Sequence, residues 1–130
     1  MIARGLRVLV CGGRNYRDRD HIWNTLCEID STRGPIVCVI HGAATGADDE
    51  AMIWAQTVQH CKHAPFVADW QKHGKSAGPI RNQRMIYEGK PNLVVAFPGG
   101  RGTADLVSRA KAHQIEVIEV AARSPPEGGQ

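Results

Sequence analysis

Residues 93–103 read LVVAFPGGRGT and predict a buried strand that runs directly into a helix through a glycine-rich turn. The five apolar residues at 93–97 are typical of a strand, and the residues from 102 onward repeat with helical periodicity. Glycines at this junction leave main-chain N–H groups uncovered at the positively polarised start of the helix. The stretch therefore predicts a pocket for an anion such as a phosphate group.

Two further segments repeat this order of strand, glycine turn and helix. The run LRVLVC at 6–11 leads into GGRN at 12–15, and the run IVCVI at 36–40 leads into HGAATGAD at 41–48. One such turn would say little about binding, because turns favour glycine in any case. Three of them, each after a strand that looks buried, predict that the turns surround one phosphorylated ligand.

Strands and helices alternate along the chain. We expect strands at 6–11, 36–41, 63–68, 93–97 and 115–120, and helices at about 19–30, 46–59, 79–88 and 102–113. Continuous runs of Val, Ile and Leu are typical of strands covered on both faces, which indicates a parallel sheet with right-handed crossovers. The expected fold class is α/β, a Rossmann-like three-layer sandwich with a five-stranded parallel sheet. A strand order of 3-2-1-4-5 would bring the first and fourth strands, and their glycine turns, side by side.

Size and composition narrow the possibilities further. A length of 130 residues predicts one domain at 1–122, with a disordered tail at 123–130. The hydrophobic share is 42%, and no apolar run is long enough to predict a membrane span. The first residues do not resemble a secretion signal, so we expect a cytoplasmic protein. The four cysteines lack C-x-x-C spacing and are expected to be reduced.

The candidate ligand-binding residues follow the strand ends or begin a helix. They are Gly12, Gly13, Arg14, Asn15, Gly42, Thr45, Gly46, Asn82, Gly99, Gly100, Gly102 and Thr103. Arg14 could hold a phosphate with two hydrogen bonds or simply face water, and its place directly after two glycines favours the first interpretation. Arg81, two residues after a helix-starting proline, is expected to be the most useful cation in the cleft.

Asp48 allows two interpretations. Thr45 and Asp48 have the spacing of a capping box, in which both side chains bind main-chain N–H groups at the start of a helix. Alternatively, the Asp48 carboxylate touches the ligand and accepts hydrogen bonds from ribose hydroxyls, as an acidic residue does in dinucleotide sites.

Other kinds of site are not indicated. The segment HCKH at 60–63 resembles a metal cluster only in composition, so we expect no metal. The chain lacks a nucleophile elbow, a P-loop and the G-x-G-x-x-G fingerprint, so we expect no cofactor. The net charge of +3 and the aromatic share of 5% do not favour nucleic acid as a partner, because that needs a continuous basic face with interleaved aromatic side chains.

Four motifs together resemble the SLOG superfamily of nucleotide-binding proteins, in particular its short YspA/YpsA-related branch. They are VCGGR at 10–14, HGAATGAD at 41–48, GPIRN at 78–82 and FPGGRGTAD at 97–105. The resemblance implies a Rossmann-like fold with a cleft at the carboxyl ends of the strands. It also implies recognition of a nucleotide or nucleotide derivative, and assembly as a homodimer.

The superfamily also contains the Lonely Guy phosphoribohydrolases, which cleave the N-glycosidic bond of nucleoside 5′-monophosphates. Their signature resembles PGG-x-GT-x-x-E, preceded by an arginine four residues before a methionine, and Arg81 and Met85 match that pair. The glutamate position falls on Leu106, and Asp105 points about a hundred degrees away from it on an ideal helix.

Two alternative functions follow from these relatives. In an N-glycosidase, Arg81 and the turn amides would hold the 5′-phosphate, while Asp48 or Asp105 would stabilise positive charge at the ribose C1′. Other relatives with this fold bind single-stranded DNA, which gives a nucleic-acid-handling module as the second alternative.

Overall fold

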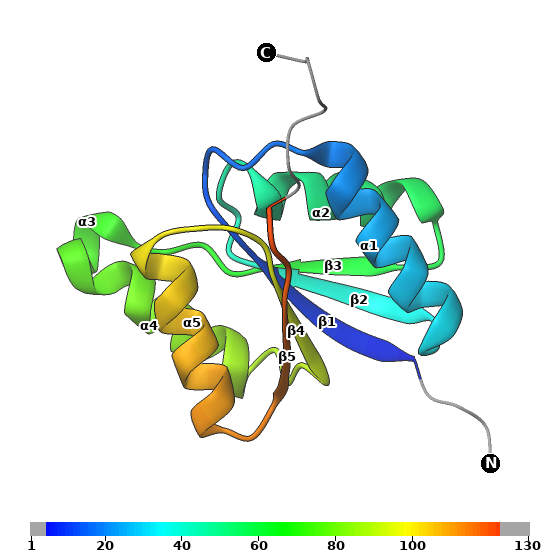
Figure 1. The fold of residues 1–130 in the computed structure, drawn as a ribbon. Coiled ribbons are helices and arrows are strands. Elements are labelled where there is room, and N and C mark those ends of the chain that lie inside the picture. The colour runs from blue at the N-terminus through cyan, green and yellow to red at the C-terminus, as the bar shows by residue number, and fades with distance from the viewer. Residues whose placement is uncertain (1–4, 123–130) are drawn as a thin grey trace.

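A five-stranded parallel sheet forms the centre of the molecule. The computed structural model describes residues 5–122, and the strand order is β3-β2-β1-β4-β5 (Figure 1). The strands are β1 (Leu6–Cys11), β2 (Ile36–His41), β3 (Lys62–Pro65), β4 (Leu93–Ala96) and β5 (Glu116–Glu119). Every neighbouring pair runs parallel, with Val8 of β1 opposite Val39 of β2 and Leu93 of β4. The predicted fold class and strand order are confirmed.

Helices cover both faces of the sheet because successive strand residues point to opposite sides. Val8 and Val10 face a core shared with α1 (Arg19–Thr32) and α2 (Ala47–Val58). Leu9 and Cys11 face a second core, shared with α4 (Ala77–Tyr87) and α5 (Arg101–Ala112). In Figure 1 the two helix pairs accordingly lie on opposite sides of the strands.

The connection between β3 and α4 differs from the prediction. Strand β3 ends at Pro65, three residues before the expected end, and a short helix α3 (Trp70–His73) and a 3-10 turn η1 (Gly74–Ser76) follow it. Helix α4 then begins at Ala77, so that Pro79 lies inside its first turn, where proline is tolerated. Arg81 and Asn82 therefore lie one turn into the helix.

The other helix boundaries follow local chemistry. Asp18 caps α1 by accepting a hydrogen bond of 3.2 Å from the His21 N–H. The last turn of α4 is followed by Lys90, whose φ is +51°, and then by Pro91, which cannot continue a helix. The predicted tail at 123–130 lies outside the described residues.

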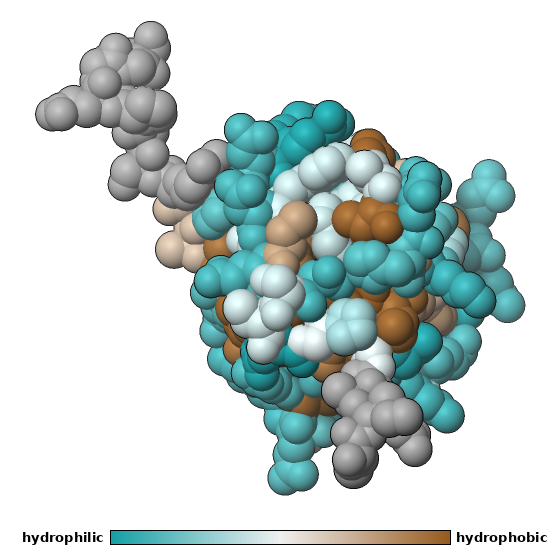
Figure 2. All heavy atoms as spheres, turned by 90° about the vertical axis from the view of Figure 1, so that its right-hand side faces the viewer, coloured by the Kyte–Doolittle hydropathy of each residue, from teal (hydrophilic) through white to brown (hydrophobic). Residues whose placement is uncertain are grey.

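The exposed side of α1 is polar. Figure 2 views the molecule from the side of Figure 1 on which α1 lies, and it shows mostly hydrophilic residues with apolar ones in small groups. Arg19, Asp20 and Glu28 are among the exposed residues of this helix. Among the described residues, no helix is long and apolar enough to cross a bilayer.

Candidate functional site

A cleft of about 1050 Å³ lies at the carboxyl ends of β1 and β4, next to the start of α5. It is at the upper end of the usual size range of small-molecule sites. The structure brings most of the predicted site residues together in its lining: Gly12, Gly13, Arg14, Asn15, Asp48, Arg81, Asn82, Gly99, Gly100, Gly102, Thr103 and Asp105. Gly42 and Thr45 instead line a neighbouring cavity of about 290 Å³, which Arg14 and Arg81 share. Gly46 lines neither.

Several glycines at the strand ends are required by the contacts between the turns. The Gly13 N–H donates a 2.8 Å hydrogen bond to the carbonyl oxygen of Pro98, which ties the first turn to the third. Gly46 has φ +81°, and a Cβ at this position would collide with the carbonyl oxygen of Gly13. A Cβ on Gly99 would lie 2.8 Å from the Gly13 nitrogen. These glycines let the three turns pack against one another.

Gly100 and Gly102 differ from the glycines that hold the turns together. A Cβ on either would meet no atom within 4 Å, so neighbouring atoms do not require glycine at these positions. Both residues line the cleft at the start of α5. The N–H groups of Arg101, Gly102 and Thr103 have no hydrogen-bond partner among residues 5–122. The start of this helix therefore offers three donors and a positive dipole end to the cleft.

Asp48 is buried, with 6% of its surface exposed, and it reaches back to the turn before its helix. Its Oδ2 accepts hydrogen bonds from the N–H groups of Gly42, at 2.7 Å, and Ala44, at 3.5 Å. Burial raises the pKa of Asp48 to about 6, although these two bonds and the charges of Arg81 and Arg14 oppose the rise. Oδ1 of Asp48 has no hydrogen-bond partner among residues 5–122.

The capping-box interpretation of Thr45 and Asp48 is wrong. Gly46 is the residue before α2, and no side chain caps that helix. The Thr45 hydroxyl instead donates to the carbonyl oxygen of Arg14 at 3.1 Å. Gly46, which has a positive φ, occupies the cap position itself, so Thr45 binds the first turn and Asp48 binds the turn before its own helix.

Two arginines face the cleft in different ways. Nη1 of Arg81 donates a 2.6 Å hydrogen bond to the carbonyl oxygen of Gly42, the same residue whose N–H binds Asp48. Burial and the charge of Arg14 lower the pKa of Arg81, while Asp48 opposes the change. Arg14 is exposed, and its guanidinium carbon lies 5.6 Å from the ring centre of Trp70. Arg14 forms no ion pair with any described residue.

Asp105 is already engaged by two neighbours in the wall of the cleft. Its Oδ2 accepts hydrogen bonds from Arg109 Nε at 2.8 Å and from Asn82 Nδ2 at 3.0 Å. Burial alone would raise the pKa of Asp105, but these two bonds outweigh it and lower the pKa. Asn82 also donates to the carbonyl oxygen of Gly102 at 3.1 Å, so it fixes the first turn of α5 to α4. Leu106 lies beside them and is 1% exposed.

Each histidine of the HCKH segment is hydrogen-bonded to a residue outside the segment. Nδ1 of His63 lies 3.0 Å from Nε2 of His41, and His60 Nε2 lies 2.9 Å from Asp30. Nδ1 of His41 accepts from the Ala43 N–H at 3.1 Å, so its Nε2 carries the proton and donates to His63. Burial lowers the pKa of His41 to about 4. No metal-binding cluster of three or more His, Cys, Asp or Glu occurs within 5–122.

Several residues of the cleft wall were not among the predicted site residues, and Tyr16, Trp70 and Lys75 belong to none of the motifs described above. Trp70 begins the short helix α3, which periodicity could not reveal because the helix has only four residues. One signal was available in Asp69, whose side chain accepts from the Lys72 N–H at 3.0 Å and caps this helix. That signal predicts a helix start but does not place it at the cleft.

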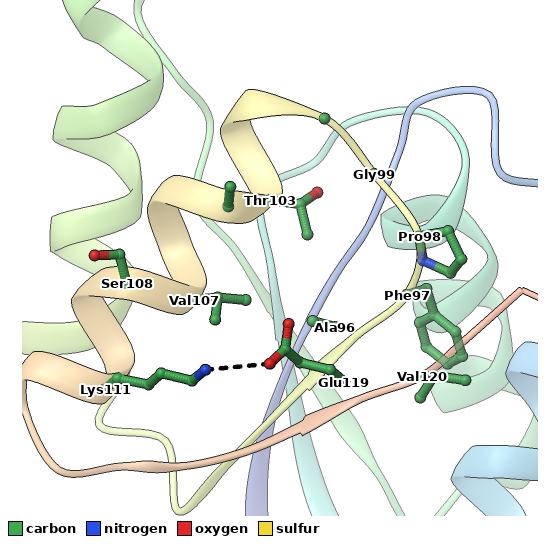
Figure 3. A pocket seen from close by; sticks show the side chains of 12 residues that line it. Ala96, Phe97, Pro98, Gly99, Thr103, Val107, Ser108, Lys111, Glu119 and Val120 are labelled. Atoms are coloured by element: carbon green, nitrogen blue, oxygen red, sulfur yellow. Dashed lines mark hydrogen bonds and ion pairs between the residues drawn. The ribbon is translucent and has the colours of Figure 1, made fainter.

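A second cavity, of about 540 Å³, lies on the other side of the turn at 98–100. Figure 3 shows Thr103, Val107 and Lys111 of α5 facing Glu119 and Val120 at the end of the sheet. Lys111 Nζ and Glu119 Oε2 lie 3.1 Å apart across this cavity. Its one lysine is therefore paired with a carboxylate, whereas the larger cleft contains the cations of Arg14 and Arg81.

Comparison with known proteins identifies the family of the chain. Residues 6–73 match the model of the YspA, cpYpsA-related SLOG family. The chain is also 39% identical over 119 residues to the Gene 61 protein of Mycobacterium phage D29, a match that covers 86% of this chain and 94% of that protein. The family match includes the first two glycine turns and β1 to α3. The chain thus belongs to the YspA, cpYpsA-related SLOG family.

Proposed function

We propose that the protein binds a nucleotide or nucleotide-derived phosphate compound in the 1050 Å³ cleft, with a phosphate group at the start of α5. The observation that carries this proposal is that the N–H groups of Arg101, Gly102 and Thr103 have no hydrogen-bond partner among residues 5–122 and lie at a cleft that Arg14 and Arg81 also line. Membership of the SLOG family suggests a nucleotide-related ligand.

The lining residues divide into two groups in this proposal. Gly100, Gly102 and Thr103 approach the phosphate directly, and Arg14 adds a charge-assisted bond from an exposed side chain. Gly13, Gly46 and Gly99 act indirectly, because they let the turns pack closely enough to form the cleft. Arg81 contributes charge and also holds the turn at Gly42.

Calorimetric titration with AMP, ADP and ADP-ribose tests the proposal. The variant Arg14→Gln should bind the tightest of these about ten- to a hundredfold more weakly, which corresponds to one lost charge-assisted hydrogen bond. Arg17→Gln is the matched control, because Arg17 is an exposed arginine of the same loop that does not line the cleft. Gly100→Leu should abolish binding, since it places a large side chain at the start of α5, where the Cβ position is open and the phosphate is proposed to bind.

Two results would contradict the proposal. One is wild-type protein that binds none of the three compounds. The other is that Arg17→Gln weakens nucleotide binding as much as Arg14→Gln does. The effect of Arg14 would then come only from the net charge of the protein and not from contact with the ligand.

Cleavage of the N-glycosidic bond is a second candidate function. Its supporting observation is that two carboxyl groups of one cleft have pKa values shifted in opposite directions, that of Asp48 upward to about 6 and that of Asp105 downward. Such a separation is typical of sites that need one proton-holding and one ionised carboxyl group. Asp48 would then carry the proton, while Asp105 would stabilise positive charge at the ribose C1′.

Chromatography of the free base tests this candidate on a panel of nucleoside 5′-monophosphates. A glycosidase should lose at least about a hundredfold in base release in Asp48→Asn while still binding the nucleotide. Absence of base release from every compound would leave the protein a binding domain. The homodimer and the cytoplasmic location stay predictions.

A further inference from the structure

Trp70 is an exposed aromatic ring at the edge of the cleft. Its exposed fraction is 48%, and it lines both the large cleft and the neighbouring 290 Å³ cavity. Large apolar side chains are usually buried where they serve the fold, as Trp54 is in this protein with 1% exposed. Packing in the hydrophobic core therefore does not explain why a tryptophan occupies position 70.

The surroundings of Trp70 fix its position. Asp69 caps α3, the helix that begins with Trp70. The ring edge lies against the start of α4, where a Cβ on Gly78 would be 3.3 Å from Cη2 of Trp70. The guanidinium of Arg14 lies 5.6 Å from the ring centre, within the range of a cation–π contact. The ring is thus held from its own helix, from α4 and from the loop after β1.

A flat ring beside a cation fits the two parts of a nucleotide. The phosphate is negatively charged and would bind at Arg14 and the start of α5, while the base is flat and apolar on its faces. Stacking of a base on an aromatic side chain is favourable for any base, because every base presents a π face. The cleft contains both kinds of group within one lining.

We propose that Trp70 is the stacking platform for the heteroaromatic base of the ligand, an inference that rests on the proposed nucleotide binding. Arg14 then links the two halves of the site, since it lies over the ring and carries the charge that meets the phosphate. This assigns to the ligand a base as well as a phosphate, and it predicts weak discrimination among bases.

Calorimetric titration with AMP and with ribose 5-phosphate, which lacks the base, tests the assignment. Trp70→Ala should weaken AMP binding about ten- to a hundredfold and leave ribose 5-phosphate unchanged. Trp70→Phe should restore most of the AMP affinity. Tyr87→Ala is the matched control, because Tyr87 is an aromatic residue of α4 with 61% exposure that does not line the cleft. It should change neither affinity.

Tryptophan fluorescence gives an independent readout. Stacking on Trp70 should quench the emission of the wild type when AMP is added, and Trp70→Phe should bind AMP without that quenching. If Trp70→Ala binds both probes and the ratio of its affinities for AMP and ribose 5-phosphate equals that of the wild type, the stacking assignment is wrong. The proposed nucleotide binding is not affected by that result. Wild-type protein that binds neither probe would overturn the proposed function, and the assignment with it.

Discussion

Asp48 shows how one side chain can belong to the fold and face the cleft at once. Its Oδ2 holds the turn at Gly42, while Oδ1 is left without a partner among residues 5–122. Because the carboxyl group is buried, the native state binds its proton more tightly than the unfolded chain does, with a pKa of about 6 against an ordinary value of 3.8. Ionisation of the Asp48 carboxyl group therefore destabilises the folded state.

The pH dependence of stability should reveal this effect. Relative to Asp48→Asn, the wild type should be most stable below pH 4 and lose about 3 kcal/mol of unfolding free energy as the pH rises through 6. Asparagine keeps an oxygen for the Gly42 N–H and cannot ionise. Urea unfolding of both proteins between pH 4 and 7 measures the difference. A difference that stays flat, or that grows with pH, would be inconsistent with a raised pKa.

At the scale of the elements, the three glycine turns form one packed unit. The N–H of Gly13 binds the Pro98 carbonyl, and the Ala47 N–H lies 3.4 Å from the Gly13 carbonyl, so each turn is tied to its neighbour. Gly46 lies in the contact between the first and second turns, and it has a positive φ. Gly100 lies at the free edge of the third turn.

Alanine at Gly46 should destabilise the protein strongly, whereas alanine at Gly100 should hardly change its stability. Gly46→Ala should cost at least about 2 kcal/mol of unfolding free energy, because it strains the backbone and collides with the Gly13 carbonyl. Gly100→Ala should change it by no more than about 0.5 kcal/mol, since the φ of −102° is not in the left-handed region and no atom of the described residues lies within 4 Å of the added methyl. Thermal unfolding followed by circular dichroism compares them. Equal losses would mean that the turns do not pack as described.

The sequence carries strong signals for the strands and the turns. Continuous apolar runs at 36–40 and 93–97 are long enough to identify buried parallel strands, and the glycine after each marks the carboxyl end. Together with the expectation that the turns after the first and fourth strands lie side by side, these local features predict the strand order that the structure has. They also bring Arg14, Asp48 and Arg81 to one cleft, because carboxyl ends of parallel strands share an edge.

Features that depend on contacts between elements could not be predicted from the sequence. Thr45 and Asp48 matched the capping-box pattern, but Gly46 occupies the cap position, and the two side chains bind the turns at Arg14 and Gly42 instead. Trp70 could not be placed in the cleft, because its helix is too short to show periodicity and its ring is positioned by Arg14 and Gly78.

At the scale of the whole molecule, the sheet order places the cleft in which we propose that a ligand binds. The chain winds outward from β1 in both directions, with β2 and β3 on one side and β4 and β5 on the other. The large cleft opens at the carboxyl ends of β1 and β4. The family match covers β1 and the first two glycine turns, and the phage relative is similar over 86% of this chain.

An NMR titration of labelled protein with AMP tests the binding of a nucleotide phosphate at the start of α5 most directly. The largest amide shifts should fall on Arg101, Gly102 and Thr103, whose N–H groups gain a partner, with further shifts around Arg14. Shifts concentrated instead around Val107, Lys111 and Glu119 would place the ligand in the smaller cavity and contradict this account.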